Sequence, residues 1–137
     1  MNNVTNELRA SLENAPYPRL LGFSLLELSE GYAKVSVRVR PEHANFLGFA
    51  DGALIMSLAS YASACSSNSL GETRVGIQSN INIIATIAIG DELIAEATVT
   101  YAGETRDVTE TIVTDPNGRI IAKATGTSIT SKRNNLG

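Results

Sequence analysis

The 137-residue sequence contains no tryptophan, a single cysteine and a single histidine. The lone Cys65 cannot form a disulfide within the chain, which excludes the class of small domains that are held together by disulfides. One histidine and one cysteine do not supply the ligands of a zinc site, so we expect no bound metal. Aromatic residues make up only 5% of the chain, which argues against the stacking platforms of proteins that bind single-stranded nucleic acids.

Positive charge is also scarce, with 11 lysine and arginine residues against 14 aspartate and glutamate residues and a net charge of −3. Binding to a phosphate backbone needs a basic excess, so we expect no nucleic-acid partner. The first residues show neither the basic nor the apolar segment of an export signal, and we therefore expect a cytoplasmic protein. The length is that of one globular domain, which we assign to residues 1–137.

The chain lacks a long apolar run as well. Its most apolar stretch, residues 53–68, consists mainly of small residues and contains no charge. A helix of this length is too short and too rich in serine for a comfortable membrane span, so we expect no membrane partner. A helix that is apolar or small on all sides is instead buried on most of them.

The remaining elements follow from the periodicity of the apolar residues. Val4, Leu8 and Leu12 predict a short amphipathic helix over residues 3–14, which Pro16 and Pro18 are expected to end, so that residues 1–18 form an N-terminal lead-in. Alternating patterns predict strands at 23–28, 33–39, 76–85, 92–101, 105–114 and 120–131, followed by a polar tail at 132–137. This order predicts an α+β domain in which a hairpin precedes the buried helix and a meander of four strands covers it.

A distinctive motif lies directly before the predicted central helix. Residues 41–53 read Pro-Glu-His-Ala-Asn-Phe-Leu-Gly-Phe-Ala-Asp-Gly-Ala, which places Asn45, Gly48 and Gly52 in a fixed spacing. Together with the following strands and turns, this stretch resembles the PaaI-like group of hot-dog-fold acyl-CoA thioesterases over residues 20–129. The resemblance implies an antiparallel sheet wrapped around the helix and hydrolysis of an acyl-CoA or aryl-CoA thioester. It also implies no cofactor beyond the coenzyme A of the substrate, and a homodimer or homotetramer with the active site between two subunits.

The resemblance further implies roles for individual residues. In the family a backbone N–H at the start of the helix holds the thioester carbonyl oxygen, which implies this role for Gly52. Asn45 is expected either to shape the active-site loop or to serve only the turn of that loop. The candidates for contacts with the substrate or its coenzyme A are His43, Gly48, Gln78 and Arg106. In the family, the residue at the position of Gln78 points toward the site from the partner subunit. Arg106 is a basic residue that could contact the phosphates of coenzyme A.

Two positions depart from the family pattern. Asp51 stands where the family has histidine, and Ser60 stands where it has the catalytic carboxylate. Asp51 is therefore the carboxylate left to act as a base or orienter, and the alternative is that it only caps the helix. A triad of Ser60, His43 and Asp51 is a further arrangement that the sequence leaves open. The absence of a carboxylate at residue 60 also allows a catalytically silent hot-dog module that binds acyl-CoA or another small ligand.

Overall fold

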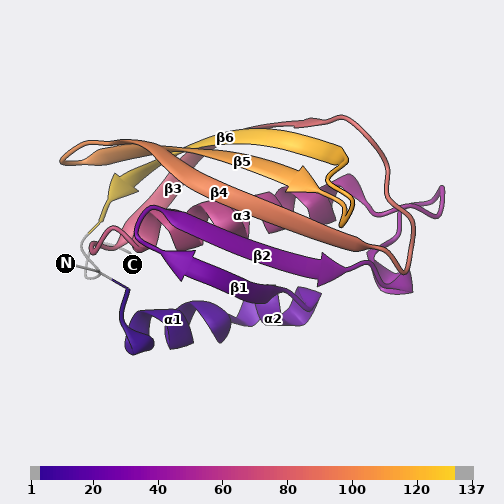
Figure 1. Cartoon of the computed structure of the whole chain (residues 1–137), viewed down its shortest axis with the longest axis horizontal. Helices are drawn as coiled ribbons and strands as arrows, with labels where there is room; N and C mark the ends of the chain where they lie inside the picture. Colours follow the sequence, from indigo (N-terminus) through magenta and orange to yellow (C-terminus); the bar gives the residue numbers. More distant parts are fainter. Residues whose placement is uncertain (1–3, 132–137) are drawn as a thin grey trace.

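The computed structural model describes residues 4–131 and contains the helices and strands labelled in Figure 1. In chain order the elements are α1 (Asn6–Glu13), α2 (Pro16–Leu21), β1 (Ser24–Ser29), β2 (Tyr32–Arg38), a short 3-10 helix η1 (Pro41–His43) that the figure does not label, α3 (Gly52–Asn68), β3 (Arg74–Ile83), β4 (Glu92–Ala102), β5 (Arg106–Thr114) and β6 (Ile120–Thr130). Each of the six predicted strands is present, with ends that differ from the prediction by two residues at most. The predicted tail at 132–137 lies outside the described residues, as do residues 1–3 of the lead-in.

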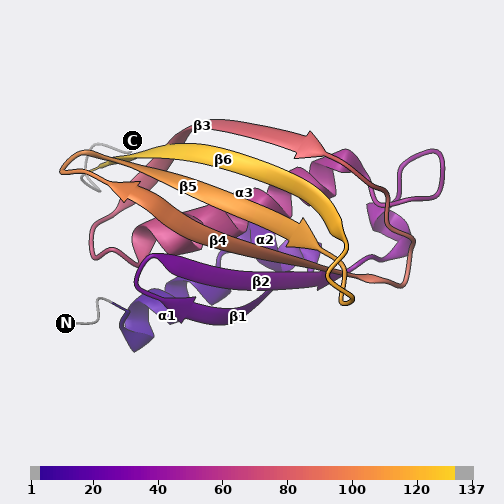
Figure 2. The same cartoon turned by 45° about the horizontal axis from the view of Figure 1, so that its top comes forward.

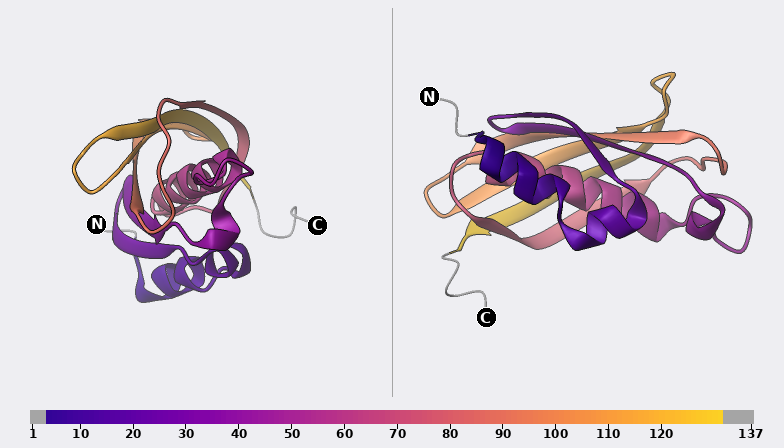
Figure 3. Two further views of the ribbon diagram at one scale, coloured as in Figure 1. Left: turned by 90° about the vertical axis from the view of Figure 1, so that its right-hand side faces the viewer. Right: turned by 90° about the horizontal axis from the view of Figure 1, so that it is seen from below.

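The six strands form one antiparallel sheet that curves around α3. Seen along the long axis, the sheet encloses α3 on most sides, while α1 and α2 lie outside it near β1 (Figure 3, left). This arrangement confirms the predicted α+β fold, an antiparallel sheet wrapped around a central helix. No helix in the described part of the chain has the length and apolar character needed to cross a membrane.

The predicted meander of four strands is wrong in the position of β3. The strand order is β1-β2-β4-β5-β6-β3, so that β3 pairs with β6 at the far edge of the sheet and not with β4 (Figure 2). The alternation of apolar residues predicts on which face of the sheet each side chain lies, but it does not predict which strands are neighbours. The pattern of β3 is compatible with pairing to β4 and with pairing to β6. As a result, β3 is an edge strand with a row of backbone groups on its open side.

The prolines also act differently from the prediction. The first helix ends at Glu13 as expected, but Pro16 then opens a second helix, α2, where only the end of a helix and a lead-in segment were predicted. Proline is tolerated in the first turn of a helix, where its missing N–H has no partner in any case. The second helix brings Tyr17 against α3, where its hydroxyl lies 3.1 Å from Ser57 Oγ.

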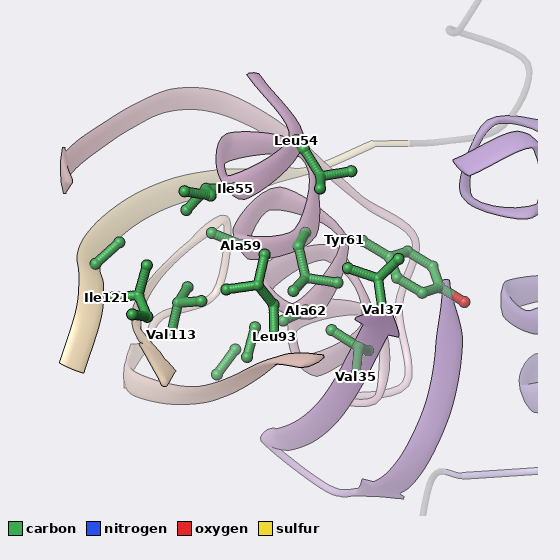
Figure 4. Packing of buried hydrophobic residues seen from close by; sticks show 14 of the residues in the cluster. Val35, Val37, Leu54, Ile55, Ala59, Tyr61, Ala62, Leu93, Val113 and Ile121 are labelled. Carbon is green, nitrogen blue, oxygen red and sulfur yellow. The ribbon is translucent and has the colours of Figure 1, made fainter. Parts of the chain in front are cut away.

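The core lies between α3 and the concave face of the sheet. Nine of the 17 residues of α3 are buried, which confirms the burial predicted from its small apolar residues. Figure 4 shows Ile55 and Ala62 of α3 packed with Leu93 and Val113 of the sheet. The helix nevertheless leaves Met56 and Ser60 exposed, so one side of it remains open to the surroundings.

Candidate active site

The start of α3 carries two of the candidate residues. Asp51 is the N-cap of the helix, and its Oδ1 accepts a hydrogen bond of 2.8 Å from the Ala53 amide. The next residue, Gly52, is the first residue of the helix, and its N–H has no hydrogen bond to any described residue. The positive end of the helix dipole and a free N–H donor therefore coincide at Gly52.

A side chain at residue 52 would have little space. A Cβ atom at this position would lie 3.2 Å from Cδ1 of Ile83, at the end of β3. This contact is tighter than ordinary van der Waals packing, so a side chain here would press on Ile83. Because glycine has no Cβ, the backbone at the start of the helix can be approached closely by a ligand.

The loop before the helix is held together by Asn45. Its Oδ1 accepts hydrogen bonds from the amides of Leu47 at 3.0 Å and Phe49 at 3.2 Å. Gly48 has a φ of 86°, in the left-handed region, and its N–H donates to the Asn45 carbonyl. The two residues thus form the turn that leads the chain to Gly52.

His43 is buried and lies at the end of η1, directly before this loop. Its Nδ1 accepts a hydrogen bond of 2.9 Å from the Arg40 amide, and its Nε2 lies 3.1 Å from Arg40 Nη2. Burial, together with the charge of Arg40, lowers the pKa of the imidazole below its ordinary value. Among the described residues no hydrogen bond joins the ring to Asp51 or to Ser60, so the geometry gives the Ser60–His43–Asp51 triad no support.

Ser60 lies two turns further along α3, between two cavities. One cavity, of about 380 Å³, has an aromatic and apolar wall that includes Tyr17, Phe23 and Ile81. The other, of about 310 Å³, has several hydroxyl-bearing residues and Gln78 in its wall. Ser60 lines both cavities, so the structure brings Ser60 and Gln78 together.

The candidate residues of one chain therefore form two separate groups, one around Gly52 at the start of α3 and one around Ser60 and Gln78. At a rise of 1.5 Å per residue, Gly52 and Ser60 lie about 12 Å apart along α3. Arg106 belongs to neither group, because it is the exposed first residue of β5 and lines neither of these two cavities. Between residues 4 and 131, no three histidine, cysteine, aspartate or glutamate side chains gather where they could hold a metal ion.

A buried polar network near Ser60 was not predicted. Arg74 Nη1 donates a hydrogen bond of 3.1 Å to Asp107 Oδ1, and Ser67 Oγ donates one of 2.6 Å to Asp107 Oδ2. The exposed fractions of the Arg74 and Asp107 side chains are 6% and 0%. A signal was present in the sequence, because Asp107 has the same strand phase as the buried Thr109 and Val113.

The sequence is similar to those of known proteins. The family model described as Thioesterase superfamily matches residues 43–122, from η1 to the start of β6. A protein of Archaeoglobus fulgidus with the name "Putative esterase" is 36% identical to the chain over 108 residues, which cover 79% of this chain and 70% of that protein.

The fold is also similar to those of solved structures. The E. coli PaaI protein, from the phenylacetic acid degradation operon, superimposes with a TM-score of 0.87 at 27% identity and covers 90% of each chain. A Streptococcus mutans protein bound to acetyl CoA has a TM-score of 0.77 at 30% identity, covering 80% of this chain and 88% of its own. The chain therefore belongs to the Thioesterase superfamily and has the hot-dog fold of its PaaI-like members.

Proposed function

We propose that this protein hydrolyses acyl-CoA or aryl-CoA thioesters at a site shared between two subunits. The observation that carries the proposal is the free N–H of Gly52 at the positive end of α3. An N–H in this position polarises the thioester carbonyl and stabilises the oxyanion that forms when a nucleophile attacks it. Membership of the family and the relative bound to acetyl CoA support a coenzyme A thioester as the ligand.

Asp51 is the base in this proposal. One of its carboxylate oxygens accepts the capping hydrogen bond from Ala53, and the other has no hydrogen bond to a described residue. The second oxygen accepts a proton from a water molecule, which attacks the carbonyl carbon. The tetrahedral intermediate then collapses with cleavage of the C–S bond, and the sulfur of coenzyme A leaves with the proton that Asp51 took from the water, so that Asp51 is again a carboxylate.

The two groups of candidate residues support a shared site. Gly52 and Ser60 of one chain are too far apart to contact the same thioester group. The open edge of β3 suits antiparallel pairing with β3 of a second copy, because this pairing gives partners to its exposed backbone groups. Antiparallel pairing sets the two α3 helices side by side in opposite directions, with Ser60 and Gln78 of one chain facing Gly52 of the other. A dimer satisfies this arrangement, and a tetramer is a pair of such dimers.

A catalytically silent module that binds acyl-CoA is the second candidate. It is favoured by Ser60, whose hydroxyl has no hydrogen bond to a base among the described residues. Serine without a base is a poor nucleophile and no base at neutral pH. In this case the fold keeps the binding site and lacks turnover.

Release of free thiol from short, long and aryl CoA thioesters tests the proposal and separates the two candidates. We expect the wild-type protein to release coenzyme A from at least one thioester well above the uncatalysed rate. The Ser60→Asp variant, which restores the family carboxylate, is measured beside it. Turnover by Ser60→Asp alone would contradict the hydrolase proposal and support the silent module.

A further inference from the structure

The apolar cavity beside Ser60, of about 380 Å³, has a contact between two helices in its wall. Tyr17 of α2 and Ser57 of α3 both line it, and the Tyr17 hydroxyl lies 3.1 Å from Ser57 Oγ. A second cavity, of about 210 Å³, lies at the start of α3, and Tyr17 and Ser57 are the two residues that line both cavities. The contact between their hydroxyls therefore lies between the two cavities.

The two cavities differ in what they offer a ligand. The wall of the first includes Ile81 and the stacked rings of Phe23 and Tyr61, and no charged residue of the described chain lines it. The wall of the second includes Glu42 and Asp51. A hydrocarbon chain is stabilised by apolar walls, whereas it would displace water from the carboxylates of the second cavity. The first cavity is therefore the one that suits the chain of an acyl group.

The ring of Tyr17 is both accessible and held in place. It is 59% exposed, so a ligand in the apolar cavity can contact it directly. Its helix α2 follows Pro16, and the preceding helix α1 is fastened to α3 by the Tyr61 hydroxyl, which donates a hydrogen bond of 2.7 Å to the Leu12 carbonyl. Together with the hydroxyl contact to Ser57, these connections fix the ring as a wall between the cavities.

We propose that the apolar cavity receives the acyl chain of the thioester and that Tyr17 closes its far end, so that this ring sets the longest acyl chain that the protein accepts. The inference rests on the proposed function, because the thioester is placed beside Ser60, which lines the same cavity. In the shared site, Asp51 of the same chain serves the other thioester. The contact of Tyr17 with Ser57 therefore also keeps the acyl chain of one site away from the base of the other.

A series of thioether analogues of coenzyme A tests the proposal without relying on turnover. S-butyl-, S-hexyl-, S-octyl-, S-decyl- and S-dodecyl-CoA differ only in chain length, and none can be hydrolysed as a thioester. In calorimetric titrations of the wild-type protein, affinity should rise about fourfold with each added CH2 group while the chain fits, and then stop rising. In Tyr17→Ala the rise should continue past this limit, because the chain enters the space that the ring occupied.

Leu20→Ala is the matched control. It truncates another exposed side chain of α2, one that lines neither cavity, so its limit should equal that of the wild-type protein. The same limit in Tyr17→Ala as in the wild-type protein, or an equal shift in both variants, overturns the inference and leaves the proposed function intact. An affinity that rises through the whole series in the wild-type protein overturns it as well.

Two further outcomes separate the inference from the proposed function. If no analogue binds the wild-type protein, the inference and the coenzyme A site fail together. If the analogues bind with the expected limit but the matching thioesters release no thiol, the inference stands and hydrolysis alone is contradicted.

Discussion

The carboxylate of Asp51 accepts a hydrogen bond of 2.8 Å from the amide of Ala53, so the proposed base is also the N-cap of α3. The two roles require different properties of the side chain. A cap needs only an acceptor oxygen, whereas a general base needs the negative charge and its affinity for a proton. Substitutions that remove one property and keep the other can therefore separate the roles.

Asp51→Asn should keep the cap and lose the base. Asparagine caps helices about as well as aspartate, so we expect little change in the free energy of unfolding, while thiol release should fall by about a hundredfold or more. Asp51→Ala should lose turnover and also about 0.5–2 kcal/mol of stability. Urea unfolding and thiol release from the best thioester substrate measure both quantities. Full turnover in Asp51→Asn would leave Asp51 with the capping role alone.

The fold was largely predictable because local patterns specify each element. The alternation of buried Leu93, Ala95 and Ala97 with more exposed neighbours located β4, and the uncharged small residues located α3. The position of β3 was not predictable in the same way. Its pairing with β6 depends on how the sheet closes around α3, which no single strand encodes.

The candidate site was predictable only where its residues are close in the sequence. The motif from Asn45 to Gly52 located the loop and the start of α3 directly. The ion pair between Arg74 and Asp107 was missed, because the two residues are 33 positions apart and meet only through the packing of separate strands. The cavity beside Ser60 was missed for the same reason, since α3, β3 and β6 each supply part of its wall.

The stability of the fold should depend on the protonation of His43, the only histidine of the chain. Burial and the nearby Arg40 lower the pKa of the folded imidazole below its ordinary value of 6.5. In acid the unfolded chain therefore binds this proton before the folded chain does, and the folded state loses stability as the pH falls below about 6.5 toward the lowered pKa. Above about pH 6.5 the contribution of His43 is fully present.

Urea unfolding at about pH 7.5 and at about pH 5.5 measures this dependence. His43→Asn is the control, because its Oδ1 can accept the hydrogen bond from the Arg40 amide but does not titrate. We expect a smaller loss of stability between the two pH values in this variant than in the wild-type protein. Equal losses in the two proteins would assign the pH dependence to the carboxylates instead.

Asp107→Asn should strongly destabilise the protein. The substitution leaves the charge of Arg74 buried without a counter-ion, for which we expect a loss of about 3–5 kcal/mol in the free energy of unfolding. Glu13→Gln is a matched control, because it removes one charge from the largely exposed Arg9–Glu13 pair. The control should lose about 0.5 kcal/mol or less. A comparable loss in both variants, measured by urea unfolding, would show that the buried pair contributes no more than a surface pair.

Gly52→Pro should remove the proposed oxyanion donor and leave α3 in place. Proline has no N–H, and it is favoured at the first position of a helix, which residue 52 occupies. Asp51 already has the extended conformation that a following proline requires, with φ −64° and ψ 143°. We therefore expect a native circular dichroism spectrum and a decrease in kcat of about a hundredfold to a thousandfold. Gly52→Ala is the control, since it introduces the same Cβ contact with Ile83 Cδ1 but keeps the N–H. If the two variants lose the same activity, the loss comes from crowding against Ile83 and not from the missing donor.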